Sequence, residues 1–288
     1  MVESLLTPFV EYGFMRRALV GCVALSVAAP AVGVFLMLRR MSLTGDAMAH
    51  AILPGAAVGY LISGLSLGAM TVGGIVAGLI VALCASLVAR VTVQREDASL
   101  AAFYLISLAL GVLIVSSRGS SVDLMHVLFG TVLALNDEAI LLIASVASLT
   151  LVVLALLYRP LVVECLDPGF LASVSRLGPV VHHAFMILVV LNLVAGFHAL
   201  GTLMAVGILI LPAAAARFWA HDVNTLILVA VAVAMGSCVV GLLVSYHFGV
   251  ATGPSIILTA GVCYVISVLV APSGVVTRRV LTARHYEA

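Results

Sequence analysis

Residues 39–55 read RRMSLTGDAMAHAILPG and place two ionisable side chains, Asp46 and His50, inside a membrane-length apolar region. Because the two residues are spaced i and i+4, on a helix they project from the same face, with Cβ atoms roughly 5–6 Å apart. A carboxylate and an imidazole together suit a divalent transition metal, whereas sodium or potassium is more often held by oxygens alone. The spacing therefore predicts a metal-binding pair. The alternative is that Asp46 caps the helix and His50 packs against a neighbour.

Composition sets the environment of this stretch. Hydrophobic residues make up 64% of the 288 residues, charged residues only 9%, and the mean hydropathy is +1.31. Such values are typical of an integral membrane protein. The uncharged runs predict an all-α, polytopic fold of about eight or nine membrane helices, because about 20 apolar residues are needed to cross a bilayer. We expect residues 1–288 to form a single transmembrane domain.

The basic residues exclude one function class. All 13 of them are arginine, and the chain contains no lysine. A phosphate-binding P-loop requires a lysine, so an ATPase that drives this protein must be another polypeptide, and the chain itself is expected not to be an enzyme. The five cysteines are scattered without close pairing, which argues against a zinc cage or a disulfide framework.

The expected membrane spans follow the apolar runs, and Pro54 with Gly55 should kink or interrupt the second of them. Residues 116–137 are too polar for a lipid-facing helix and too apolar for a free loop, which indicates a re-entrant or cavity-lining segment around Asp123. Residues 1–14 predict a short helix at the membrane interface. The expected spans are residues 18–38, 42–62, 67–89, 98–115, 139–158, 182–200, 202–216, 223–246 and 255–270.

Arginines in short loops set the expected orientation, because cytoplasmic loops retain positive charge. The arrangement that places most arginines inside requires an odd number of spans and leaves the N-terminus outside. Residues 159–178, the longest polar stretch between spans, are then cytoplasmic, and we hypothesise that residues 164–176 form a short helix that docks on an ATPase. Aspartate followed by proline is a typical helix start. The expected coupling residues are Glu164, Asp167, Pro168 and Phe170.

Over nearly its whole length the sequence resembles the zinc and manganese permease family of bacterial ATP-binding-cassette importers. The most specific match is residues 38–55, with Leu-Arg-Arg-Met-Ser, Gly-Asp, His and Pro-Gly in order. The resemblance implies a multi-pass subunit of the bacterial inner membrane that forms a homodimer in lipid and binds no nucleic acid. It also implies two cytoplasmic ATPase subunits and an extracytoplasmic metal-binding protein as partners. The other matching blocks lie within residues 14–18, 123–130, 167–170, 207–214 and 245–254.

The resemblance also implies roles for individual residues. The family's aspartate and histidine fall on Asp46 and His50, and the region of Asp123 is a further position of the metal pathway. A later aspartate of the family is missing, because Gly249 stands in its place. His247, two positions earlier, is then a candidate for a substitute ligand. The alternative is that His247 only lies at the membrane interface.

We expect zinc as the transported substrate, with no cofactor, because a site with two imidazoles and one carboxylate favours zinc over manganese. A manganese or iron importer permease is the main alternative. An ion-gradient-driven transporter is less favoured, since outside Asp46 and Asp123 the acidic residues cluster at turns. A membrane metalloenzyme is less favoured too, because the sequence has no His-Glu-x-x-His motif or equivalent.

Overall fold

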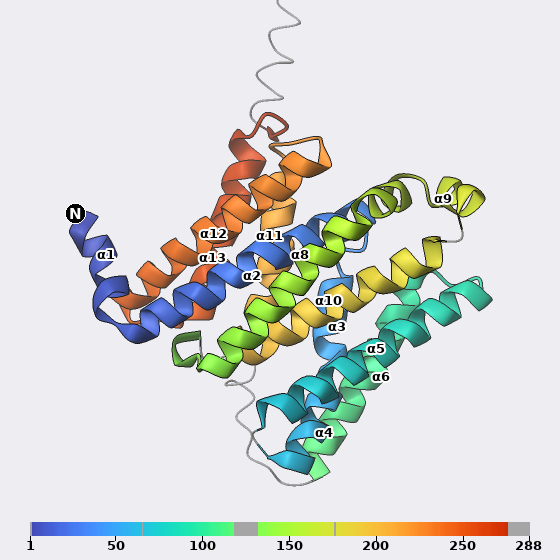
Figure 1. Cartoon of the computed structure of the whole chain (residues 1–288), viewed down its shortest axis with the longest axis horizontal. Coiled ribbons are helices and arrows are strands. Elements are labelled where there is room, and N and C mark those ends of the chain that lie inside the picture. The colour runs from blue at the N-terminus through green and yellow to red at the C-terminus, as the bar shows by residue number, and fades with distance from the viewer. Residues whose placement is uncertain (1, 65, 118–131, 176, 276–288) are drawn as a thin grey trace, which may run out of the picture.

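The computed structural model describes residues 2–64, 66–117, 132–175 and 177–275, and within these ranges every regular element is a helix (Figure 1). The long helices are α2 (Gly13–Leu38), α5 (Leu67–Val91), α6 (Glu96–Ser117), α8 (Asp137–Leu166), α10 (Gly178–Leu200), α12 (Val223–Phe248) and α13 (Thr252–Val270). The shorter ones are α1 (Val2–Glu11), α3 (Thr44–Ala51), α4 (Leu53–Ser63), α9 (Pro168–Val174), α11 (Thr202–Ala216) and the 3-10 turn η1 (Val132–Ala134).

Among the described residues, 7 helices are long and apolar enough to cross a membrane, which confirms the predicted all-α membrane fold. Together, α3 and α4 occupy the predicted second span, and α11 occupies the predicted short one. α8 continues to Leu166, past the predicted end of its span at residue 158, so the first part of segment 159–178 is helical. Asp123 and most of the predicted re-entrant segment lie outside the described residues.

α2 is the central helix of the bundle, with α12 and α13 on one side and α4, α5 and α6 on the other (Figure 1). It packs along α8, α11 and α12, and small residues allow these neighbours to approach closely. A Cβ atom on Gly33, for example, would overlap the carbonyl oxygen of Leu209 on α11. α2 is mostly buried, whereas α6, α8 and α13 bury only a minority of their residues inside the bundle, as lipid-facing helices do.

α4 and α5 pack backbone against backbone. Gly55 on α4 faces Gly73 on α5, and a Cβ atom on either glycine would overlap the carbonyl oxygen of the other. One turn along α4, a Cβ atom on Gly59 would overlap the backbone of Ala69 in the same way. Helices approach this closely only where no side chain separates them. Gly73 therefore serves the packing of α5 on α4.

The predicted interruption of the second span is present. α3 ends at Ala51 and α4 begins at Leu53, with Pro54 in its first turn, where the missing N–H of proline is tolerated. Ile52 between them keeps right-handed helical torsions (φ −73°, ψ −29°), so the junction is a bend rather than a loop. The hydroxyl of Ser107 on α6 donates to the carbonyl of Ala51 (2.9 Å), which satisfies a buried acceptor at the bend.

A tight turn joins α2 to α3. The N–H of Arg40 donates to the carbonyl of Met37 (3.1 Å) and the N–H of Met41 donates to the carbonyl of Leu36 (2.9 Å), which is the bonding pattern of a Schellman helix end. This motif places one residue in the left-handed conformation, and here that residue is Arg40 (φ 60°) instead of the usual glycine. Because Met41 and Leu36 are both buried, the turn fixes the direction of α3 relative to α2.

Replacing Arg40 with glycine should stabilise the protein modestly. The left-handed conformation destabilises a residue other than glycine by about 1–2 kcal/mol, and the larger entropy loss of glycine on folding offsets roughly 0.5–1 kcal/mol of this gain. We expect a net stabilisation of about 0.5–1 kcal/mol, measured as a higher Tm of the purified protein in detergent. Arg217, which ends α11 at φ −60°, provides the control, because glycine there should lower the Tm. A lower Tm for both variants would contradict the strain at Arg40.

Candidate functional site

The predicted metal-binding pair lies on α3. Nε2 of His50 is 3.8 Å from Oδ1 of Asp46, one helical turn away, so the two side chains share a helix face. Asp46 lies in the first turn, where the partial positive charge of the helix N-terminus favours a carboxylate. The N-cap position is Leu43, and no side chain caps the helix. Asp46 therefore does not take the alternative role of a helix cap.

The surroundings of the pair leave room for a ligand. The side chain of Asp46 is 64% exposed and that of His50 is 33% exposed. The His50 ring stacks on Tyr104 of α6, with ring centroids 6.3 Å apart. Within the described part of the chain, the buried Nδ1 of His50 has no hydrogen-bond partner. Since ionisable side chains in membrane segments face a protein interior or a water-filled cavity, we expect a metal pathway or another subunit over the exposed face of Asp46.

His247 does not join this pair. It lies in the last turn of α12, where its Nδ1 is 2.9 Å from the carbonyl oxygen of Leu243 and its ring packs against Tyr246. Tyr246 packs against Tyr12 at the start of α2, whereas α3 follows the other end of α2. Across the described residues, no three histidine, cysteine, aspartate or glutamate side chains gather as a metal site. The predicted three-residue site is therefore not formed within one chain.

The segment predicted to dock a partner contains α9, which starts where the aspartate and proline predicted. Oδ1 of Asp167 accepts a hydrogen bond from the N–H of Phe170 (2.9 Å) and so caps the helix. Phe170 and Val174, one turn apart, are 56% and 69% exposed, while Leu171 is buried. α9 projects from one edge of the bundle (Figure 1), which we call the α9 end. Exposed apolar side chains grouped in this way are typical of a contact with another protein or with a membrane.

Glu164 is not part of α9, although the sequence placed it on the docking helix. It lies near the end of α8 and joins a set of charged side chains that the sequence patterns did not reveal. Oε2 of Glu164 is 2.8 Å from Nη2 of Arg39, and Nη1 of Arg39 is 3.1 Å from Nδ1 of His182. Nε2 of His182 is 2.9 Å from Oε1 of Glu96. The sequence indicated only that each of these four residues stands near the end of an expected membrane span.

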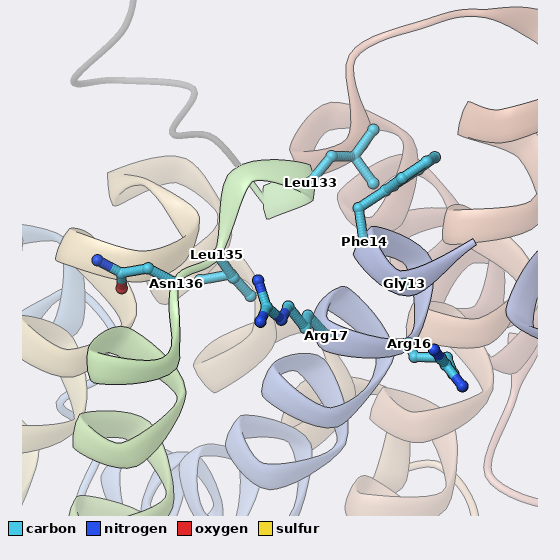
Figure 2. Close-up of a pocket in the computed structure, with 7 residues that line it drawn as sticks. All are labelled: Gly13, Phe14, Arg16, Arg17, Leu133, Leu135 and Asn136. Carbon is cyan, nitrogen blue, oxygen red and sulfur yellow. The ribbon is translucent and has the colours of Figure 1, made fainter.

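The opposite end of the bundle carries an open pocket of about 510 Å³ (Figure 2). Figure 2 shows Arg17 reaching towards Leu135, while Arg16 points away from it. Arg17 also pairs with Asp137 at the start of α8 (3.1 Å), an exposed contact that contributes little to stability. The pocket offers positive charge and holds none of the predicted metal ligands. Its lining residues are Gly13, Phe14, Arg16, Arg17, Leu133, Leu135 and Asn136.

Comparison with known proteins decides the family. The sequence profile of the ABC 3 transport family matches residues 11–271. The chain belongs to the ABC 3 transport family. This ABC 3 protein is 33% identical over 272 residues to the manganese import system permease protein ScaB of Streptococcus gordonii, covering 94% of this chain and 96% of ScaB. It is 30% identical over 270 residues to the manganese transport system membrane protein MntC of Halalkalibacterium halodurans, covering 93% of this chain and 91% of MntC.

The fold of this ABC 3 family member resembles that of a solved structure. The structure described as PsaBC from Streptococcus pneumoniae in complex with Fab superposes with a TM-score of 0.84 at 30% sequence identity. The superposition covers 98% of this chain and 100% of that one. The ABC 3 family and the apolar helices together make the protein a multi-pass protein of the bacterial inner membrane.

Proposed function

We propose that the chain is the membrane-spanning permease subunit of an ATP-driven manganese importer. The observation that carries the proposal is the similarity to a manganese permease across 94% of the chain. The pair of Asp46 and His50 supports it, because a carboxylate with water ligands suits manganese and the imidazole completes a transition-metal site. Manganese is the transported substrate in this proposal and not a bound cofactor.

Manganese replaces zinc as the proposed cargo. The expectation of zinc depended on a second imidazole from His247, and one chain does not bring His247 to Asp46 and His50. The pair then supplies one carboxylate and one imidazole, and its remaining coordination positions are open to water and other oxygen ligands. Such a shell suits manganese better than a nitrogen-rich one. The match to the ABC 3 transport family over residues 11–271 favours a permease over a hydrolytic metalloenzyme.

The two ends of the bundle suit two different partners. At the α9 end, Phe170 and Val174 provide an exposed apolar contact for the ATPase subunit that this lysine-free chain requires. At the other end, the pocket beside Arg16 and Arg17 suits a binding protein that delivers the metal. The exposed face of Asp46 suits a second copy of the chain, which would enclose the metal pathway between two subunits.

Metal uptake into proteoliposomes that contain the chain, its ATPase and the binding protein loaded with each metal in turn tests this proposal. We expect ATP-dependent uptake of manganese in preference to zinc, measured with both radioactive metals in competition. His247→Ala is a matched control, because its side chain lies outside the metal pair and the ratio of the two metals should not change. Preferential uptake of zinc, or uptake without the ATPase, would contradict the proposal.

A further inference from the structure

Four titratable side chains from four helix ends meet at the α9 end of the bundle. Arg39 follows α2, Glu96 begins α6, Glu164 lies near the end of α8 and His182 lies near the start of α10. The guanidinium of Arg39 contacts Glu164 (2.8 Å) and His182 (3.1 Å) and lies over the ring of Phe185, 4.7 Å from its centroid. We call Arg39, Glu96, Glu164 and His182 the charge cluster.

One hydrogen bond and two ion pairs join the charge cluster into one unit. Because arginine has donors only, Nδ1 of His182 accepts from Arg39. The ring proton of His182 then lies on Nε2, which is 2.9 Å from Oε1 of Glu96. Arg39 is 7% exposed, and Glu164 and His182 are 12% exposed. Displacing one member alone would leave a buried neighbour without its partner, so the four side chains should move together.

On one side, the charge cluster adjoins the partner-docking helix. Glu164 precedes Asp167, the N-cap of α9, by less than one helical turn. The N–H of Asp167 donates to the carbonyl of Val163 (2.8 Å), so the connection from α8 to α9 begins as a hydrogen-bonded helix end. Leu171 holds α9 against the bundle because it is buried. A displacement of α9 would therefore displace the carboxylate of Glu164.

On the other side, two structural elements link the charge cluster to the metal pair. The Schellman turn joins Arg39 directly to α3, which carries Asp46. Glu96 begins α6, and about 12 Å further along this helix, at 1.5 Å per residue, Tyr104 stacks on His50. Both members of the metal pair are thus contacted or carried by elements that end in the charge cluster.

We infer that Arg39 is a positioning residue that couples the ATPase-docking helix to the metal pair. Arg39 is linked to α9 through its ion pair with Glu164. It is linked to α3 through the Schellman turn, and to α6 through His182 and Glu96. These elements should therefore change position together. The inference rests on the proposed function, because it takes α9 as the ATPase contact and Asp46 and His50 as metal ligands. Arg39 does not touch the metal in this role. It determines how much of each ATP-driven movement reaches the metal pair.

The test measures the number of metal ions imported per ATP hydrolysed by the reconstituted complex. Arg39→Gln and Glu164→Gln each remove one charge, and the double variant removes the ion pair without leaving a buried charge unpaired. We expect the double variant to assemble with the ATPase at native yield and to hydrolyse ATP, while the ions imported per ATP fall by about tenfold or more. Arg217→Gln removes an exposed arginine that follows α11, outside the charge cluster, and should keep the native ratio.

Each outcome of this test bears on the inference. A double variant that keeps the native ratio would overturn it, and a double variant that does not assemble would show that the pair serves folding alone. A charge exchange, Arg39→Glu with Glu164→Arg, should recover part of the ratio relative to the single variants, and no recovery would count against coupling through the ion pair. If the native complex imports zinc but no manganese, the proposed cargo is wrong, and the ratio is then measured with zinc.

Discussion

Replacing Asp46 with alanine is expected to abolish manganese uptake by the reconstituted complex, and His50→Ala should have the same effect. Changes to residues that only support a metal ligand lower metal affinity by about 10–100-fold, so loss of a direct ligand should reduce uptake by about a hundredfold or more. Nε2 of His50 and Oδ1 of Asp46 are 3.8 Å apart, close enough to bind the same ion. Each single variant should therefore be nearly as defective as the double variant. The measurement is the initial rate of radioactive manganese uptake.

Two controls separate metal binding from folding in this experiment. Asp97 is an exposed acid in the first turn of α6, and Asp97→Ala should import manganese at the native rate. The variants of Asp46 and His50 should also assemble with the ATPase at native yield, because the carboxylate of Asp46 is 64% exposed and its loss leaves the core intact. Near-native uptake by both variants would remove the pair from the metal pathway. Loss of expression would show that the pair serves the fold.

Placing glutamate at both Phe170 and Val174 should prevent the ATPase from copurifying with the chain. The two side chains are 56% and 69% exposed on one face of α9. Apolar anchors at the centre of an interface often contribute about 2 kcal/mol or more each, and a carboxylate there adds the penalty of burying an unpaired charge. We expect the amount of ATPase recovered per permease from detergent to fall by at least about tenfold, which corresponds to 1.4 kcal/mol.

Two further variants test whether this loss is specific to α9. Phe248 is an aromatic side chain that is 76% exposed at the opposite end of the bundle, so Phe248→Glu should leave the recovery of ATPase unchanged. Phe170→Leu keeps an apolar side chain at the contact and should also retain the ATPase. Undiminished recovery with the double glutamate variant would place the ATPase contact elsewhere on the chain.

Features that depend on a single helical turn could be predicted from the sequence. The spacing of Asp46 and His50 placed both on one face of α3, because helix geometry alone decides this. The capping aspartate, Asp167, and the proline after it predicted the start of α9, since both act within the first turn. Pro54 likewise predicted the bend between α3 and α4, because a missing N–H acts locally.

Features that depend on helix packing could not be predicted in this way. Arg39 and His182 are far apart in sequence and meet only because the ends of α2 and α10 pack together. A charged residue at the end of an apolar span is usually solvated, so each member of the charge cluster by itself indicated no more than a membrane interface. The position of His247 could not be predicted either. It lies two residues before Gly249 in the sequence, but helix packing places its side chain away from Asp46 and His50. Gly249 itself ends α12 in the left-handed conformation (φ 63°), where glycine is favoured.

Gly55 and Gly73 leave no side chain between the backbones of α4 and α5. Small shifts between packed helices are normally absorbed by side chains that change rotamer, and at this contact there are none to change. We therefore expect α4 and α5 to move as one unit, which Ile52 joins to α3. Asp46 and His50 lie on α3, directly before this junction, so we expect a movement of the α4–α5 unit to displace the predicted metal ligands as well.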